Sequence, residues 1–297
     1  MQHFKNLVDI HLFNGFPLPE NPFFSLYKCS HTCGLADREF TSDFYMIGFK
    51  KLKAGVIMYG RTKYDHDNGS MIFIKPRQVI EFKSVEYDET AFIIFIHENY
   101  LHGHLLHHDI SKYAFFDYEI NEALHLSPRE EKVIWDLYDK IEAEYYNNTD
   151  EFSRDIILAH IDSILKYCQR FYKRQFINRA EFSGKTVSRF NEILSAYFRN
   201  GILITDSLPN VTIVAAQLNL SPRYLSDMLK QETGKTAIEL IHIYLINEAK
   251  NRLKTEDQRV SDIAYSLGFE NLSYFSRLFK KETGYTPNQF KKKVLIN

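Results

Sequence analysis

Apolar residues recur at helical spacing in two short segments near the C-terminus, and a glycine lies between the segments. Ser261 can cap the first segment, and Gly268 stands where a left-handed residue would end it. Asn271 can cap the second segment, which ends at Gly284. Two short helices joined by a tight turn predict a helix-turn-helix unit over 261–284, and the second helix of such a unit enters the DNA major groove. The predicted buried stripes are Ile263, Ala264 and Leu267 in the first helix and Phe275, Leu278 and Phe279 in the second.

The same pattern occurs once more, earlier in the chain. Residues 231–236 read QETGKT and residues 281–286 read KETGYT. Ahead of the first of these, Pro222 fills the first helical position, where its missing N–H costs nothing. The repeat predicts a second DNA-reading unit over 212–234. The matched positions are Thr212 and Ser261, Ala215 and Ala264, Leu218 and Leu267, Asn219 and Gly268, Ser221 and Asn271, Leu225 and Phe275, and Leu229 and Phe279.

One continuous helix, Ala237–Lys254, is predicted between the two units. A helix of this length spans about 27 Å at a rise of about 1.5 Å per residue. One turn of DNA is about 34 Å long, so we expect this helix to hold two reading helices at successive major-groove segments. The apolar face of the predicted helix consists of Ile238, Ile241, Leu245, Ala249 and Leu253.

The C-terminal part, residues 186–297, resembles the DNA-binding domain of AraC/XylS-type transcriptional regulators. The resemblance implies a regulator that binds promoter DNA, works with RNA polymerase, and more often activates than represses. It also implies that an effector domain with a cupin-like fold precedes the DNA-binding domain. The residues that carry the resemblance are Ile263-Ala264, Gly268-Phe269, Ser273, Phe275, Arg277, Phe279-Lys280, Gly284 and Thr286-Pro287.

The first 96 residues read mainly as short strands rich in β-branched and aromatic residues. Breaks rich in Gly, Asp and Asn separate these strands, and Pro76 stands at a bend or an edge. Strands at this spacing predict a small barrel or jelly roll. The predicted strands are Phe44–Phe49, Val56–Tyr59, Met71–Lys75, Gln78–Phe82 and Ala91–Ile96.

From His97 the apolar spacing becomes helical. Residues Ser127–Glu130 form a capping box with proline at the first helical position, and this box opens a helix to about Tyr146. A second amphipathic helix is predicted from about Asp150 to Phe176. The pair suits two uses, a dimerisation surface as in the resembling family or packing against the barrel within one domain, and both stay open.

These patterns predict an α+β chain in which a small N-terminal β-barrel, cupin-like or jelly roll, is followed by helices. An all-α domain with two helix-turn-helix units comes next. The predicted boundaries are 1–176 for the effector and dimerisation domain (barrel 1–96, helices 97–176), 177–185 for a linker, and 186–297 for the DNA-binding domain with its units at 212–234 and 261–284.

Helix geometry selects the side chains that would meet DNA. In each second helix, the outward positions near the N-terminus face the groove, and an arginine there can pair bidentately with guanine O6 and N7. Asp227 is unusual on such a surface, and it would either accept from cytosine N4 or orient Arg223 one turn earlier. Lysines on the same helices, and Lys291–Lys293, would bind phosphate or form a solvated charged face. The predicted DNA-binding residues are Arg223, Tyr224, Ser226, Asp227 and Lys230 in the first unit and Ser273, Tyr274, Arg277, Lys280 and Lys281 in the second.

Two groups of residues bear on a metal or enzyme interpretation. Cys29, His31 and Cys33 offer three ligands, but a zinc site needs four and no fourth follows. His66 alone lies among the predicted strands, so the histidine set of catalytic cupins is missing. We therefore expect no metal, no cofactor and no catalytic residue, with solvated or capping histidines between the strands and the helices. These histidines are His97, His102, His104, His107 and His108.

Composition agrees with a nucleic-acid reader joined to a regulatory domain. The formal net charge is −1, but residues 186–297 carry a small excess of Lys and Arg and residues 1–185 an excess of Asp and Glu. We expect a cytoplasmic, homodimeric regulator that binds double-stranded DNA and no membrane, and that responds to a small molecule or to self-association. The alternative is a metal-binding sensor or cupin-type enzyme with an appended DNA-binding domain.

Overall fold

The computed structural model divides the chain into two units, Met1–Gln175 and Phe176–Asn297, and each is described by itself. The described residues are 2–29, 33–35, 38–54, 58–59, 62–63, 69–82, 85–87, 90–118, 122–147, 150–183, 185–199, 208–255 and 258–295.

The N-terminal unit is built on a five-stranded antiparallel sheet. Its strand order is β13-β9-β5-β12-β2, and the three central strands form where the sequence is rich in β-branched and aromatic residues. The strands are β13 (Leu124–His125), β9 (Ser70–Ile74), β5 (Phe44–Lys50), β12 (Phe92–His97) and β2 (Phe24–Lys28).

Shorter strands form three more sheets. Among the described residues, these sheets and the five-stranded one are open and do not close into a single barrel, so the structure shows mixed helix and sheet without establishing a cupin-like barrel. One sheet holds β1 (Gln2–Phe4), β4 (Arg38–Ser42) and β10 (Ile80–Phe82); the next holds β3 (Cys33–Leu35), β11 (Val85–Tyr87) and β6 (Leu52–Ala54); the last holds β7 (Met58–Tyr59) and β8 (Thr62–Lys63).

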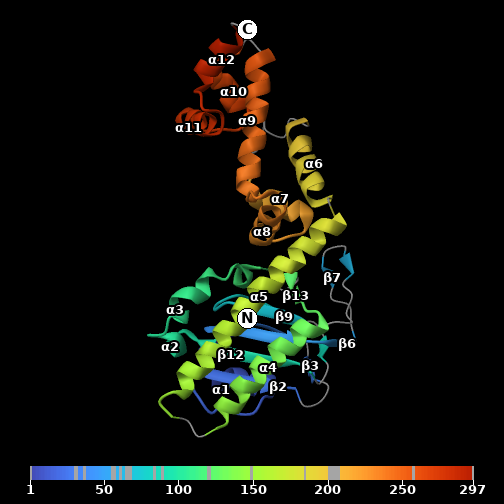
Figure 1. The fold of residues 1–297 in the computed structure, drawn as a ribbon, viewed down its shortest axis with the longest axis vertical. Coiled ribbons are helices and arrows are strands. Elements are labelled where there is room, and N and C mark those ends of the chain that lie inside the picture. The colour runs from blue at the N-terminus through green and yellow to red at the C-terminus, as the bar shows by residue number, and fades with distance from the viewer. Residues whose placement is uncertain are drawn as a thin grey trace. The chain divides into compact units, whose positions relative to one another are not determined.

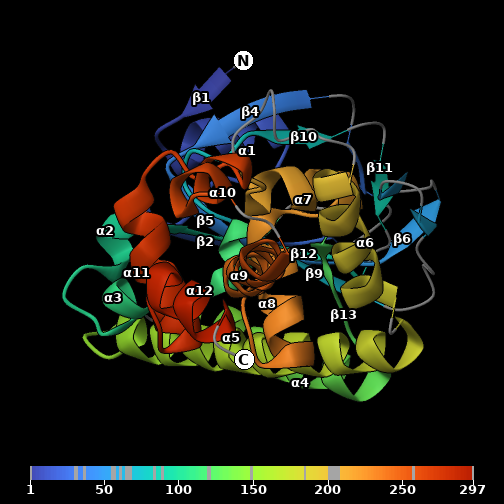
Figure 2. The same ribbon diagram turned by 90° about the horizontal axis from the view of Figure 1, so that it is seen from above.

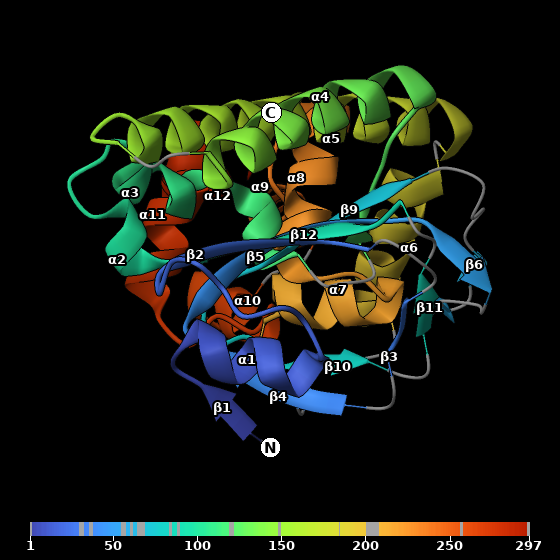
Figure 3. The ribbon, with the colours of Figure 1, turned by 90° about the horizontal axis from the view of Figure 1, so that it is seen from below.

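Two long helices cover one face of the five-stranded sheet (Figure 3). They are α4 (Pro128–Tyr145) and α5 (Ser153–Ser183), and α4 begins at the predicted capping box, in which Ser127 accepts from the backbone of Glu130. Phe92 of β12 stacks on Tyr138 with 4.1 Å between ring centroids. Arg174 of α5 forms a paired contact with Glu130, with the closest N–O distance at 2.7 Å, and so joins the two helices.

Helix α1 (Leu7–Asn14) and the β1–β4–β10 sheet lie on the other side of the five-stranded sheet (Figure 3). They share an apolar core with the facing side chains of β5, β9 and β12. Neither α1 nor β2 was among the elements predicted from the sequence. The buried members of this core are Phe4, Leu7, Ile10, Phe40, Phe44, Met46, Ile74, Ile80 and Phe95.

The chain between the sheet and α4 forms short helical turns, α2 (Glu98–Leu101) and α3 (Leu106–Asp109). Helix α5 continues beyond the predicted end at Phe176 to Ser183. Most of the predicted linker is therefore helical, because the sequence between Ile177 and Ser183 contains no proline or glycine to end the helix.

The C-terminal unit is entirely helical over its described residues (Figure 1). Helix α9 is a long straight element, and Figure 2 looks along it and shows the shorter helices around it. After the end of α5, the helices are α6 (Lys185–Arg199), α7 (Val211–Leu218), α8 (Pro222–Thr233), α9 (Ala237–Thr255), α10 (Val260–Ser266), α11 (Leu272–Thr283) and α12 (Pro287–Leu295).

Lys50, at the end of β5, is a buried lysine whose side chain lies on the α1 side of the sheet. It is 6% exposed, and burial lowers the pKa of its amine to about 8. The neighbouring Lys51 is instead paired with Glu131 of α4, at 3.5 Å.

Replacing Lys50 with methionine should stabilise the N-terminal unit at neutral pH. The unfolded lysine keeps its proton up to about pH 10.5, so the folded state loses stability as pH falls from about 10.5 to 8. We expect Lys50→Met to raise the free energy of unfolding at pH 7 by up to about 3 kcal/mol, and the gain should shrink toward pH 10.5. Urea unfolding followed by Trp135, the single tryptophan, measures this, because Trp135 packs on Phe49 and Phe92 of the same sheet.

Lys51→Met is the matched control, and it should show no such gain. A stability gain from Lys50→Met that is smaller at pH 7 than at pH 10.5 would contradict the presence of a buried cation.

Candidate nucleic-acid interface

The turn inside each helical pair uses a left-handed residue, as predicted. Asn219 ends α7 with φ of 55°, and Gly268 follows α10 with φ of 86°. Asparagine is the residue that most readily replaces glycine in this conformation. The two turns are therefore equivalent, although their sequences differ.

The second helix of each pair begins and ends in the same way. The Ser221 side chain accepts from the backbone N–H of Tyr224 at the start of α8, and Asn271 accepts from Tyr274 at the start of α11. Gly234 and Gly284 end these helices. The predicted caps of both second helices are confirmed.

The predicted caps of the first helices are wrong. Helix α7 begins at Val211 because the Asn210 side chain accepts from the backbone of Ile213, at 2.9 Å, and Thr212 lies within the first turn. Helix α10 begins at Val260 without a side-chain cap, and Ser261 is already helical. Each helix therefore begins before its predicted capping residue, Thr212 in α7 and Ser261 in α10.

The repeat extends to hydrogen bonds that sequence alone did not predict. Thr233 donates to the carbonyl of Leu229 at 2.8 Å and accepts from the backbone N–H of Lys235 at 3.2 Å. Thr283 donates to Phe279 at 2.7 Å and accepts from Tyr285 at 3.2 Å. The shared E-T-G motif therefore closes both second helices through the same threonine contacts.

Helix α9 packs against helices of both helix-turn-helix units. Its predicted apolar face is buried at Ile241, Leu245, Ala249 and Leu253, whereas Ile238 is 42% exposed and was wrongly included. The buried stripe begins one residue earlier than predicted, at the fully buried Ala237, whose backbone N–H contacts Ser226 of the preceding helix.

Polar contacts at three positions along α9 join it to its neighbours. The backbone N–H of Ala237 donates to Ser226 of α8 at 3.3 Å. The Tyr274 hydroxyl of α11 lies 3.3 Å from Nε2 of His242, whose pKa is lowered mainly by burial. Arg252 donates to Ser266 of α10 at 2.9 Å. These contacts join α9 to helices of both helix-turn-helix units.

Helix α11 exposes the predicted reading residues on one surface. Ser273, Tyr274 and Arg277 are exposed, and Phe275, Leu278 and Phe279 are buried behind them. Within the described part of the chain, no carboxylate forms an ion pair with Arg277. Lys280 and Lys281 are exposed on the following turn. The surface is therefore rich in hydrogen-bond donors and carries positive charge.

Helix α8 presents a different surface, and two of its predicted residues do not face outward. Tyr224 is fully buried, with its ring 5.1 Å from that of Phe176. Ser226 is half-buried and engaged with Ala237, as described above. Tyr224 and Tyr274 occupy equivalent positions, but Tyr224 contacts Phe176, which is remote in sequence, whereas Tyr274 contacts His242.

Arg223 and Lys230 of α8 are exposed as predicted. Arg223 forms an ion pair with Asp227, one turn later, with 3.1 Å between Nε and Oδ2. In the unbound chain Asp227 therefore orients Arg223, one of the two roles considered for it.

The predicted histidine and cysteine groups contain no metal site among the described residues. His97 caps α2 and His104 accepts from the backbone of Leu106, which confirms capping roles for these two. The Cys29–Cys33 cluster cannot be assessed as a whole, since His31 lies outside the described residues. None of the helices described is long and apolar enough to cross a bilayer.

Comparison with known proteins places the site in a recognised domain family. The helix-turn-helix domain family matches residues 214–293. A transcriptional regulatory protein of Bacillus subtilis, YesN, is 39% identical over 125 residues, which are 40% of this chain and 33% of that protein. The transcriptional activator RhaS of Klebsiella pneumoniae is 37% identical over 78 residues, 26% of this chain and 28% of RhaS. The chain thus spans about a third or less of these relatives.

A solved structure also matches part of this chain. It is the C-terminal domain of AraT, a response regulator from Geobacillus stearothermophilus, which is 32% identical. The match covers 37% of this chain and 85% of that domain, with a TM-score of 0.33.

Arg277 and Lys281 should contribute differently to binding DNA. Arg277 and Lys281 are both exposed on α11, and we expect the Arg277 guanidinium to pair with a base and the Lys281 ammonium to contact phosphate. Arg277→Ala should lose about 1–3 kcal/mol of discrimination between specific and random duplex. Lys281→Ala should weaken both duplexes alike and reduce the salt dependence by about one charge.

Fluorescence anisotropy at several salt concentrations measures both effects. Equal losses by Arg277→Ala on specific and random duplex would remove Arg277 from the base-reading residues.

Proposed function

From a C-terminal unit that carries a helix-turn-helix domain of the AraC type, we infer that the chain as a whole is a sequence-specific, DNA-binding regulator of transcription. The observation that carries this proposal is the repeated pair of helices on one continuous α9. Each pair has the same turn, the same cap on its second helix and the same threonine closure.

The length of α9 supports binding to two successive groove segments. Its 19 residues span about 28 Å at about 1.5 Å per residue. This approaches the length of one DNA turn, about 34 Å, which separates adjacent major-groove segments on one side of the duplex. One chain therefore reads two neighbouring segments, with α8 in one and α11 in the other.

The exposed residues divide into base-reading and phosphate-binding groups. Arg277 reads guanine, with Ser273 and Tyr274 beside it on the first turns of α11. In α8, Arg223 reads a base while Asp227 holds its guanidinium in position. The lysines Lys230, Lys280 and Lys281 bind phosphate and supply affinity that does not depend on sequence.

The N-terminal unit controls this binding, either by taking up a small molecule or by self-association. A cupin-like arrangement of its strands, and a homodimer formed through α4 and α5, follow the architecture implied by the family resemblance. By the same resemblance the chain is a cytoplasmic activator that acts with RNA polymerase.

A footprint on selected DNA tests the proposed function. Duplexes that the full chain retains from a random library should share a sequence. Hydroxyl-radical cleavage should show two protected segments per protomer, about 10 base pairs apart on one face. Arg223→Ala should weaken sequence preference in one segment and Arg277→Ala in the other.

Lys254→Ala, at an exposed position on α9, is the matched control, and it should preserve preference in both segments. A library without enrichment, or a single protected segment per protomer, would refute the two-segment regulator.

A further inference from the structure

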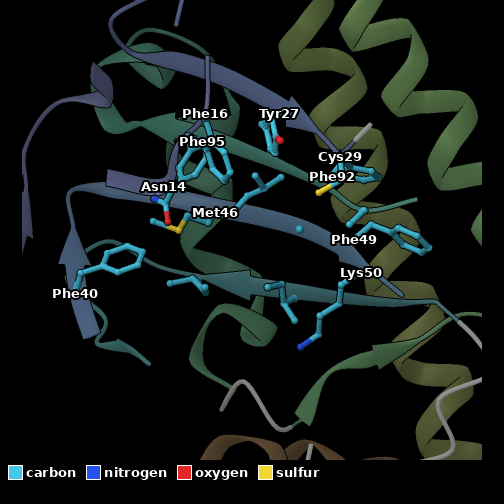
Figure 4. A pocket seen from close by; sticks show the side chains of 15 residues that line it. Asn14, Phe16, Tyr27, Cys29, Phe40, Met46, Phe49, Lys50, Phe92 and Phe95 are labelled. Atoms are coloured by element: carbon cyan, nitrogen blue, oxygen red, sulfur yellow. The ribbon is translucent and has the colours of Figure 1, made fainter. Parts of the chain in front are cut away.

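A cavity lies against the α1 side of the five-stranded sheet (Figure 4). Its empty space is about 690 Å³, part of which opens to solvent. Small-molecule sites commonly have walls that are mostly apolar, and the lining of this cavity is mostly apolar. The lining side chains come from β2, β5, β9 and β12, with Phe16 and Phe40 opposite.

The strand register explains why the sheet is hollow there. Tyr27, Ile93, Gly48 and Ile72 are neighbours across β2, β12, β5 and β9, and they form one row on the cavity face. Gly48 contributes no side chain at the centre of this row. A Cβ built at Gly48 would lie 3.0 Å from Cγ1 of Ile72, so a larger residue there would occupy the space.

Lys50 is the one charged residue among the described residues that line the cavity. It follows Gly48 by two positions on the same face of β5, and Figure 4 shows its side chain among the lining residues. Within the described part of the chain, no carboxylate forms an ion pair with its amine. The cavity therefore combines apolar walls with a buried amine that has no counter-ion among the described residues.

We propose that this cavity binds a small monocarboxylic acid with an apolar body, whose carboxylate pairs with Nζ of Lys50. Burial of an unpaired cation is unfavourable, and a carboxylate supplies both the missing charge and an acceptor. The remaining surface of the acid replaces water against Phe95, Met46 and Ile93. A single amine pairs with one negative charge, so a second carboxylate inside the cavity would be buried without a partner.

The pKa of Lys50 is consistent with this role, since a value of about 8 leaves the amine mainly protonated at pH 7. The identification of the acid as the effector rests on the proposed regulatory function. Binding of the acid to the cavity does not depend on that function.

Acids and their matched alcohols test the proposal on the unaltered full-length chain. Octanoate and 3-phenylpropanoate are compared with octan-1-ol and 3-phenylpropan-1-ol by isothermal titration at pH 7. At least one acid should bind with one-to-one stoichiometry and at least about tenfold more tightly than its alcohol. No saturable binding of either acid, or equal affinity for acid and alcohol, would overturn the proposal without any variant.

Three variants locate the site. Lys50→Met should weaken binding of the acid at least about tenfold and change the affinity for the alcohol less than about threefold. Lys51→Met, at the adjacent lysine paired with Glu131, should leave both affinities unchanged. Gly48→Leu should abolish binding of acid and alcohol alike. Acid affinity that survives in Lys50→Met, or falls equally in Lys51→Met, would overturn the assignment to Lys50.

The proposed function is tested separately, by measuring the affinity of the chain for DNA with and without saturating octanoate. Acid binding without any change in DNA affinity retains the cavity site and removes effector control. Specific DNA binding by a chain that takes up neither acid retains the regulator and overturns the acid site.

Discussion

The C-terminal unit depends on burial of one side of α9 against both helical pairs. Ile241, Leu245, Ala249 and Leu253 are each nearly inaccessible to water, and fully burying an isoleucine or leucine side chain contributes about 1.5–3 kcal/mol. Because these residues belong to a single helix, the two pairs cannot rotate independently without exposing part of this stripe. Fixed spacing of the two reading helices is therefore a consequence of packing.

The repeated unit could be predicted from sequence because its signals are local. Turn residues, caps of the second helices and the apolar stripes all lie within a few positions of one another. The first-helix caps failed because Asn210, Thr212 and Ser261 are all acceptable capping residues, and local preference does not rank them reliably. Tyr224 was placed wrongly for a different reason: its burial depends on Phe176, which lies far away in the sequence.

The N-terminal unit shows where sequence reasoning ends. Strands β5, β9 and β12 were predicted from their β-branched and aromatic residues, whereas helix α1 has no amphipathic pattern because most of its residues are apolar. The cavity could not be predicted from the sequence. It arises where cross-strand register places Gly48 between Ile93 and Ile72, and register is a property of the folded sheet. The burial of Lys50 could not be predicted either, because lysine is almost never fully buried in folded proteins.

The spacing between the two protected DNA segments tests the rigidity of α9 most directly. A selected duplex is altered by inserting 5 or 10 base pairs between the two protected segments, and the affinity of one protomer is measured by mobility shift. Five base pairs turn the second segment to the opposite face, and ten restore the face while adding about 34 Å. A rigid α9 predicts that both insertions abolish the contribution of the second segment. Full affinity after the ten-base-pair insertion, with loss after five, would show that the two pairs are flexibly joined and would contradict this account.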